Sequence, residues 1–425
     1  MANQQTGSDP LSADLLIVGG GISGITAAVE AAEAGKTVVL IEKEPYLGGR
    51  VAQMFHYFPK LCPPSCGLEI NFRRIKDNRK IHYYTLSEVE NVSGEAGNFE
   101  VTVKKNPRYV NENCTACGLC EPAVTAERDS DFDFGMKKTK AIYLPHEMAF
   151  PLRYVIDMSA VKDKSELKGA VDACPYEAID LDEEPQSLKF HVAGVVWATG
   201  WKPYDAEKIE NLNFGKYPNI ITNMMMERIG APNGPTEGKI LRPSDQKEVK
   251  SVAFVQCAGS RDENHLPYCS GICCMASLKQ ATYVREQYED SQVHIFFIDA
   301  RTPGRLEDFY QKRQEDENIK IYRGKVAEIT EVGDGNLKVK AENTVTGEMT
   351  EVEVEMVVLA TGMVPNVADN PPANITLDDY GFMAPANDST GIVGAGVTMR
   401  PQDVAASVQD GTGAVLKSLI AAARR

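Results

Sequence analysis

The feature that most constrains the fold is a glycine-rich turn near the N-terminus. The stretch ADLLIVGGGISGITAAVEAAEAGKTVVLIEKE has the pattern of a strand, a turn, a helix and a second strand. Gly19, Gly21 and Gly24 have the G-x-G-x-x-G spacing, which permits a tight turn and a close approach of the backbone to a pyrophosphate. Glu42 ends the second strand, where a carboxylate is expected to bind a ribose. The sequence therefore predicts an α/β domain that binds an adenine dinucleotide.

Three further motifs favour FAD over NAD as that dinucleotide. LGGR at residues 47–50 follows Glu42 closely, and VVWATG (195–200) and VVLATG (357–362) are paired strand-to-loop crossings. This arrangement is similar to the FAD-containing, disulfide-reductase-like flavoproteins, which are built from two dinucleotide-binding domains. The resemblance implies FAD in the first domain. The expected FAD contacts are Gly19, Gly21, Ile22, Ser23, Gly24, Glu42, Lys43, Gly49, Arg50, Ala198, Thr199, Gly200, Thr361, Gly362, Gly394 and Gly396.

The second dinucleotide-binding unit lacks a complete fingerprint. The stretch SVAFVQCAGSRDEN begins as an apolar strand, but the glycine spacing is missing and Cys257 occupies the turn. Without those glycines the backbone cannot come close to a pyrophosphate. We therefore expect the second domain to have lost NAD(P)H binding.

The segment NENCTACGLCEPA has the cysteine spacing of an iron–sulfur loop. Cys114, Cys117 and Cys120 form C-x2-C-x2-C, but the x3-C-P continuation of a bacterial ferredoxin is absent. Cys174, followed by Pro175, has the form of such an ending. In two-cluster ferredoxins this cysteine binds the cluster of the other repeat, so the four cysteines predict one complete [4Fe–4S] site. The alternative is zinc, which prefers two separated C-x2-C knuckles.

A second group of four cysteines follows the incomplete fingerprint. Cys257, Cys269, Cys273 and Cys274 have the spacing C-x11-C-x3-C-C. Adjacent cysteines point in different directions, so both could bind one cluster only in an irregular loop or at the start of a helix. Free cysteines are also often small buried apolar residues. Spacing alone leaves both interpretations open.

The stretch QCAGSRDENHLPYCSGICCMASLKQA closely resembles the flavin subunits of heterodisulfide reductases. The ferredoxin-like insertion and AIYLPHEMAFPLRYVID fit the same family, so the resemblance covers nearly the whole chain. It implies that the second group of cysteines holds an atypical [4Fe–4S] cluster beside FAD, and that Lys279 lies near the flavin. The chain length and the reduced insertion look most like the A subunits of quinone-interacting membrane-bound oxidoreductases.

That likeness implies a function in electron transfer. In such complexes electrons pass between a membrane quinone pool and soluble adenylylsulfate reductase. The implied partners are a sister iron–sulfur flavoprotein and a membrane subunit with haem or iron–sulfur centres. The expected location is the cytoplasm, at the inner membrane through these partner subunits.

Two features depart from the pattern of related flavoproteins. The final flavin-binding segment carries Val397 where an aspartate is usual, which puts the ribityl contact in doubt. Cys62 and Cys66 lie shortly after the LGGR turn, roughly where disulfide reductases carry a dithiol. They are either redox-active or merely structural thiols. A thiol–disulfide oxidoreductase that uses this pair against FAD is thus the alternative function, and a non-catalytic docking scaffold is another.

Charge and hydropathy exclude other classes of protein. A net charge of −15 argues against nucleic acid as a partner, because such a surface repels phosphates. No apolar run has the roughly 20 residues of a membrane-spanning helix, so membrane contact is expected only through a partner. The first 14 residues are expected to be a disordered lead, and the six histidines, which lack ligand spacing, to be structural or exposed.

The predicted fold class is α/β, with two dinucleotide-binding domains and a ferredoxin-like iron–sulfur insertion. The expected segments are 12–106 and 186–248 for the FAD-binding domain, 107–185 for the insertion, 249–362 for the second nucleotide-binding-like domain and 363–425 for the C-terminal part of the FAD-binding domain.

Overall fold

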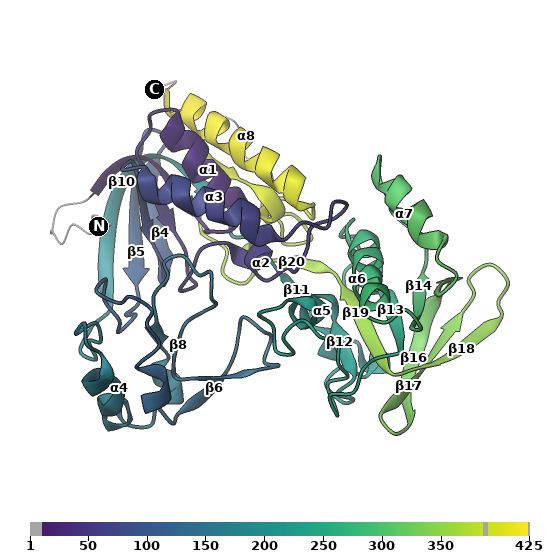
Figure 1. The fold of residues 1–425 in the computed structure, drawn as a ribbon. Helices are drawn as coiled ribbons and strands as arrows, with labels where there is room; N and C mark the ends of the chain where they lie inside the picture. Colours follow the sequence, from purple (N-terminus) through teal and green to yellow (C-terminus); the bar gives the residue numbers. More distant parts are fainter. Residues whose placement is uncertain (1–10, 386–389, 424–425) are drawn as a thin grey trace.

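Two β-sheets form the frame of the molecule in the computed structural model, which describes residues 11–385 and 390–423 (Figure 1). The first sheet has the order β3-β2-β1-β10-β5-β4, with β21 paired to β10. β10 pairs in parallel with β1 and antiparallel with β5, so a parallel core carries an antiparallel edge. Its strands are β1 (Leu11–Val18), β2 (Val38–Ile41), β3 (Ile81–Tyr84), β4 (Ser87–Glu95), β5 (Asn98–Lys105), β10 (Gln186–Trp197) and β21 (Ile392–Gly394).

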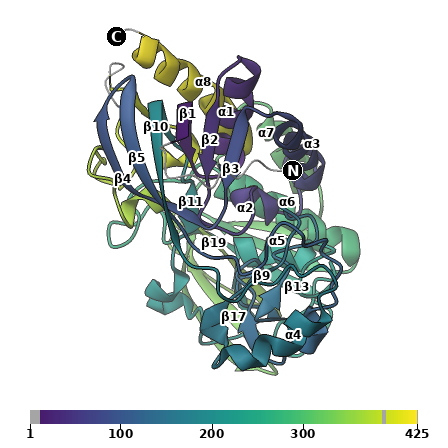
Figure 2. The same cartoon turned by 90° about the vertical axis from the view of Figure 1, so that its left-hand side faces the viewer.

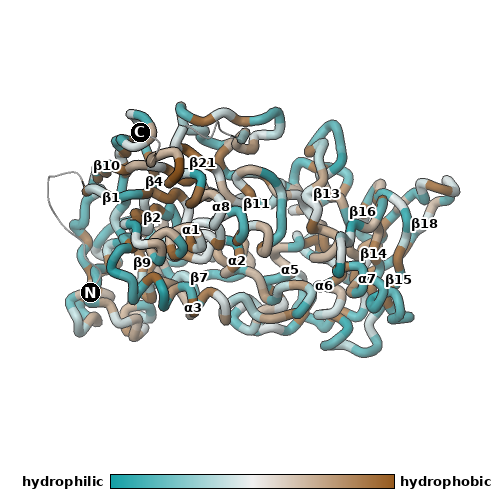
Figure 3. The backbone as a smooth tube through the Cα atoms, turned by 90° about the horizontal axis from the view of Figure 1, so that it is seen from above, coloured by the Kyte–Doolittle hydropathy of each residue, from teal (hydrophilic) through white to brown (hydrophobic). Residues whose placement is uncertain are grey.

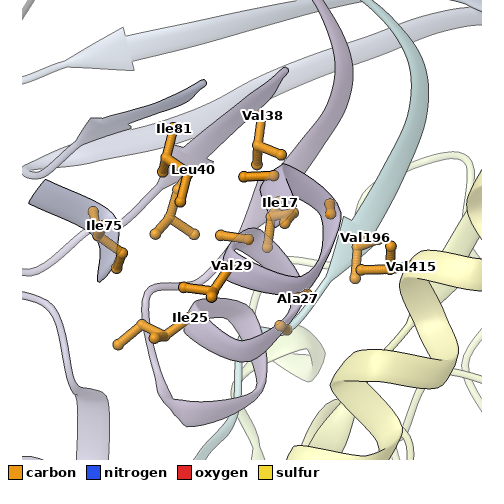
Figure 4. Packing of buried hydrophobic residues seen from close by; sticks show 14 of the residues in the cluster. Ile17, Ile25, Ala27, Val29, Val38, Leu40, Ile75, Ile81, Val196 and Val415 are labelled. Carbon is orange, nitrogen blue, oxygen red and sulfur yellow. The ribbon is translucent and has the colours of Figure 1, made fainter. Parts of the chain in front are cut away.

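Three helices pack against this sheet, namely α1 (Ile22–Glu33), α3 (Pro64–Asp77) and α8 (Val404–Ala423), and the short α2 (Gly49–Ala52) follows the LGGR turn. α1 begins after Gly21 and buries an alanine-rich face, which lets it lie close to the strands. Figure 4 shows Ile25 and Val29 of α1 beside Leu40 of β2, with Val415 of α8 near Val196 of β10. Burial of each large apolar side chain stabilises the fold by roughly 1.5–3 kcal/mol.

The second sheet is parallel and has the order β12-β19-β13-β14-β15. Its strands are β12 (Ile220–Thr222), β13 (Ser251–Ala258), β14 (Gln292–Phe297), β15 (Ile319–Arg323) and β19 (Met356–Thr361), and its helices are α5 (Asn223–Gly230), α6 (Cys273–Gln287) and α7 (Leu306–Gln314). Because β12 pairs with β19, this sheet takes strands from before residue 249, the boundary expected from the sequence. β11 (Trp201–Pro203) and β20 (Met363–Pro365) pair antiparallel where the chain passes between the sheets.

An antiparallel meander extends the second domain. It consists of β16 (Lys325–Gly333), β17 (Asn336–Glu342) and β18 (Met349–Val354). Figure 3 shows hydrophobic segments gathered around β2, β4 and β21 of the first sheet, while many outer loops are hydrophilic. Within the described part of the chain, no helix combines the length and apolar character needed to cross a bilayer.

The insertion leaves the first sheet after β5 and returns to it at β10. It is built from β6 (Glu127–Asp129), β7 (Lys138–Lys140), β8 (Ile142–Tyr143), β9 (Val155–Ile156) and α4 (Lys168–Ala173). Figure 2 shows α4 and α8 at opposite ends of the molecule. The loop between β6 and β7 reaches α5, where Arg228 Nε lies 2.9 Å from Asp133 Oδ1 and both side chains are buried.

The disordered lead expected over the first 14 residues does not include residues 11–14. Residues 1–10 lie outside the described residues, but Leu11, Ser12 and Ala13 already belong to β1. They pair with Phe190, His191 and Val192 of β10. Strand pairing thus orders residues 11–14, whose polar composition gave no strand signal.

Candidate functional site

A cavity of about 900 Å³ lies where the two sheets and the insertion meet. Its walls come from the β1–α1 turn, the LGGR turn, the β6–β7 loop, α5, α6 and the residues before α8. Parallel sheets bind ligands at the carboxyl ends of their strands. Gly19 and Ala198, which directly follow β1 and β10, both line this cavity. The predicted residues that line the cavity are Gly19, Gly21, Ile22, Ser23, Glu42, Lys43, Gly49, Arg50, Ala198, Thr199, Gly200 and Lys279.

Five glycine and threonine positions expected to contact the cofactor lie behind the cavity wall, namely Gly24, Thr361, Gly362, Gly394 and Gly396. A Cβ on Gly24 would meet Gly19 O at 1.8 Å, and one on Gly396 would meet Ser23 Oγ at 2.1 Å. Close packing therefore explains why glycine stands at both positions. These residues pack behind the segments that line the cavity and are themselves absent from the lining.

Glu42 anchors one end of the cavity. Its Oε2 accepts a hydrogen bond from Gly20 N at 2.6 Å, and its Oε1 accepts one from Glu44 N at 2.8 Å. Burial raises the pKa of the Glu42 carboxyl to about 7. Buried carboxylates need additional donors, and ribose hydroxyl groups are such donors.

The geometry of Gly21 suits a pyrophosphate. Its φ of −75° is accessible to any residue, and a Cβ built on it meets nothing within 4 Å. Since Gly21 lines the cavity, glycine leaves space there for a ligand against the N-terminus of α1. Arg50 lies on the same wall and donates from Nε to Trp201 O at 3.1 Å.

Several residues of the cavity wall were not singled out by the sequence. Four of them present buried side-chain atoms without a hydrogen-bond partner among the described residues, namely His56 Nδ1, Thr139 Oγ1, Gln280 Oε1 and Gln402 Oε1. Phe132 and Phe134 come from the insertion loop. His56, which the sequence led us to expect as structural or exposed, thus belongs to the cavity wall. These contacts arise from segments far apart in the sequence, so no local spacing signals them.

Lys279 reaches the cavity wall from the second turn of α6. Its Nζ lies 2.8 Å from Glu227 Oε1 and donates to His56 O at 2.7 Å. Glu227 also accepts hydrogen bonds from Gln280 Nε2 at 2.6 Å and Phe55 N at 3.0 Å. Both side chains are only 3% exposed, so Lys279 and Glu227 form a buried pair beside the cavity.

The segment that carries Val397 also lines the cavity. Val397 is buried and offers no polar group, whereas the neighbouring Thr398 Oγ1 accepts a hydrogen bond from Gly200 N at 3.2 Å. The backbone then reaches Asp403, whose Oδ1 accepts from Ala406 N at 2.7 Å at the start of α8. Asp403 lines the cavity as well, so a carboxylate stands six residues beyond Val397.

The residues of the cavity fit FAD. One continuous space is lined by a carboxylate placed to bind a ribose, a glycine turn with open space, an arginine and four polar atoms without a partner among the described residues. No corresponding glycine turn is available at the end of β13. There a Cβ on Gly259 would meet the Tyr204 ring at 2.5 Å, so an aromatic side chain covers the approach.

The four cysteines of the insertion converge. Cys114, Cys117, Cys120 and Cys174 line one small pocket, together with Gly118 and Tyr154. Burial raises the pKa of the Cys120 thiol to about 11, and the charges of the three other thiols add to the rise. Backbone N–H groups of Ala116 and Ala178 donate to Cys114 Sγ and Cys174 Sγ, each at 3.4 Å.

The four thiols around this pocket could hold a cluster or a zinc ion. Zinc would draw four sulfurs to about 2.3 Å from a single point. A cubane binds each thiolate at a different iron, so its ligands surround a larger space.

The second group of cysteines lies around the start of α6. Cys257 stands near the end of β13 in left-handed backbone, with φ of +56°, while Cys273 and Cys274 are the first residues of the helix. Burial raises the pKa of the Cys273 thiol, and the charges of Cys274, Cys257 and Cys269 raise it further. The structure thus brings all four together at a helix N-terminus.

Cys62 and Cys66 lie apart from these sites. Both are free and exposed, at the start of α3, and neither lines the cavity. Cys62 is nevertheless linked to the cavity wall, because Cys62 O accepts a hydrogen bond from Tyr57 N at 2.9 Å.

Comparisons with known proteins agree with this site. Residues 14–61 match the family of FAD dependent oxidoreductases. The chain is 37% identical, over 96% of its length, to an iron-sulfur A subunit of the CoB–CoM heterodisulfide reductase of Methanopyrus kandleri, and covers 64% of that protein. It is 39% identical, over 94% of its length, to its counterpart in Methanocaldococcus jannaschii and covers 63% of it. The chain therefore spans less than two thirds of these relatives.

Among solved structures, thioredoxin reductase from T. acidophilum has a similar fold. The TM-score is 0.54 at 17% identity, and the alignment covers 96% of this chain and 98% of the reductase. This confirms the predicted α/β fold. The chain is thus similar to the A subunits of heterodisulfide reductases over most of its own length, and its N-terminal segment matches FAD dependent oxidoreductases.

Proposed function

We propose that this chain is an electron-transfer flavoprotein subunit that carries FAD and two [4Fe–4S] clusters. Bound FAD exchanges electrons in pairs or singly, and clusters exchange them one at a time, so together they connect unlike carriers. The chain's own residues hold the centres close and keep water out.

One observation carries this proposal. The first turn of α6 holds Cys273 and Cys274, and Ile272 and Ala276 of the same segment line the FAD cavity. A cluster on these cysteines would therefore lie beside the flavin cavity. The cysteine groups come from distant parts of the chain, so their double convergence favours clusters over scattered buried thiols.

We further propose that the chain has the role of the A subunit in a quinone-interacting membrane-bound oxidoreductase. Its partners would be a sister iron–sulfur flavoprotein and a haem or iron–sulfur membrane subunit, with adenylylsulfate reductase as the soluble partner. It would lie in the cytoplasm, at the inner membrane through those subunits. The sequence likeness to such subunits supports this role, as does the lack of a complete nicotinamide fingerprint in the second domain.

The first experiment is anaerobic purification with flavin and iron quantified. We expect about one FAD and about eight iron atoms per chain. We also expect no bleaching of the flavin by stoichiometric NADH or NADPH, because Tyr204 covers the turn that would bind a nicotinamide cofactor. Rapid bleaching in partner-free protein would contradict the proposal.

The second experiment tests the assembly. Gentle detergent extraction from native membranes should bring out this chain together with an iron–sulfur flavoprotein and a haem-type membrane subunit. Recovery of a free monomer that turns over a small substrate unaided would overturn the proposal. The alternative, a thiol–disulfide oxidoreductase that uses Cys62 and Cys66, is less favoured because neither thiol lines the FAD cavity.

A further inference from the structure

An arginine lies among the second group of cysteines. Arg261 follows Cys257 by four residues, in the loop that connects β13 to α6, and its N–H donates to Tyr268 O at 3.1 Å, next to Cys269. Its guanidinium donates to Asp299 Oδ1 at 2.5 Å, and Asp299 O lies 3.8 Å from Cys274 Sγ. This network therefore ties Arg261 to three of the four cysteines.

The charge of Arg261 acts directly on the thiols. The Arg261 side chain lies within hydrogen-bonding reach of the Cys257 thiol, where its positive charge also acts. Arg261 also interacts electrostatically with Cys269. Asp299 and Arg301 are the other charged groups here, with Arg301 Nε 3.5 Å from Asp299 Oδ1.

We infer that Arg261 is a positioning residue that sets the reduction potential of the cluster held by Cys257, Cys269, Cys273 and Cys274. The inference rests on the proposed function, because it requires a cluster at these cysteines. Reduction adds one negative charge to a cluster, and a nearby cation stabilises the more negative state. Arg261 therefore raises the potential, and Asp299, which shares its charge, limits the rise.

The first cysteine pocket provides an internal reference. Arg261 belongs to the β13–α6 loop and is absent from the pocket of Cys114, Cys117, Cys120 and Cys174. A change at Arg261 should therefore shift one cluster of the chain and leave the other unchanged. A purely structural role would show as loss of iron or of stability instead of a shift in potential.

The experiment is a redox titration of the anaerobically purified full chain, followed by electron paramagnetic resonance. The signal that disappears in Cys257→Ala identifies the second cluster. We expect Arg261→Gln to lower the potential of that signal, Arg261→Lys to lower it less, and Asp299→Asn to raise it. The matched control is Arg285→Gln, which removes an arginine that pairs with Asp316 at 2.9 Å elsewhere on α6 and should cause no shift.

An unchanged potential in Arg261→Gln with full iron content overturns the inference. If Arg261→Gln loses iron, Asp299→Asn decides, since a rise supports the inference and no change overturns it. Failure of the proposed function gives a different result. In that case wild-type protein would contain only about four iron atoms, and Cys257→Ala would leave them in place.

Discussion

Glu42 is a buried carboxyl on the cavity wall whose ionisation affects stability. Burial raises its pKa from 4.5 to about 7, so the flavin-free folded chain keeps a proton that the unfolded chain loses earlier. This contribution to stability is present below pH 4.5 and is lost as the pH rises through 7. We expect the melting temperature of flavin-free protein to fall between about pH 5 and 8 more steeply in wild type than in Glu42→Gln. Equal slopes in a calorimetric comparison would contradict this expectation.

Cys174 permits a second test at the scale of one residue. It lies about 54 residues beyond Cys120, and the structure brings both into one pocket. Cys174→Ala should remove about half of the iron, because one cluster loses its fourth ligand. The matched control is Cys62→Ala, an exposed thiol outside both cysteine groups, which should retain all the iron. Unchanged iron in Cys174→Ala, measured after anaerobic purification, would refute the ligand assignment.

At the scale of elements, two glycines in the turn between β1 and α1 have different tasks, since one leaves space for the cofactor and the other permits close packing. A Cβ on Gly21 meets open space, whereas one on Gly24 meets Gly19 O at 1.8 Å. Gly21→Leu should therefore fold but lose FAD, because its side chain fills the pyrophosphate position. Gly24→Ala should instead lower the melting temperature, since α1 must move away from the turn. Absorbance at flavin wavelengths and thermal unfolding of both variants distinguish the two effects.

Much of the β1–α1 turn could be predicted, because its function depends on residues that are close together in the sequence. The spacing of Gly19, Gly21 and Gly24 with Glu42 follows from the needs of a tight turn and a ribose, and the structure places all but Gly24 on the cavity wall. The two cysteine groups were also visible as spacing. The convergence of Cys174 with the C-x2-C-x2-C loop was predicted as well, whereas spacing alone left that of the second group open, because it depends on a loop that begins with Cys257 in left-handed backbone.

The remaining wall could not be predicted because it depends on contacts between elements. His56, Gln280 and Phe132 come from three segments and meet only after both sheets and the insertion pack. β12 is three residues long and carries little signal of its own, so its membership in the second sheet depends on pairing with β19. Pairing between strands that are far apart in the sequence leaves no periodic pattern of residues from which it could be predicted.

At the scale of the whole molecule, the buried pair of Asp133 and Arg228 links the insertion to the second domain. Breaking one partner of such a pair costs about 3–5 kcal/mol. We expect Asp133→Ala to unfold at lower urea concentration and to release FAD faster, because Phe132 and Phe134 of the same loop line the cavity. Flavin fluorescence after dilution measures the release. Asp182→Ala, which breaks an exposed pair with Lys164, is the control and should change little.

The same loop has a consequence for how the protein matures in the cell. The β6–β7 loop forms part of the cavity wall and is held by a buried ion pair, so this wall is complete only after the insertion has packed against α5. A chain whose insertion is still unpacked therefore presents only part of its FAD-binding surface. During biosynthesis, tight retention of the flavin should begin only once the insertion has docked.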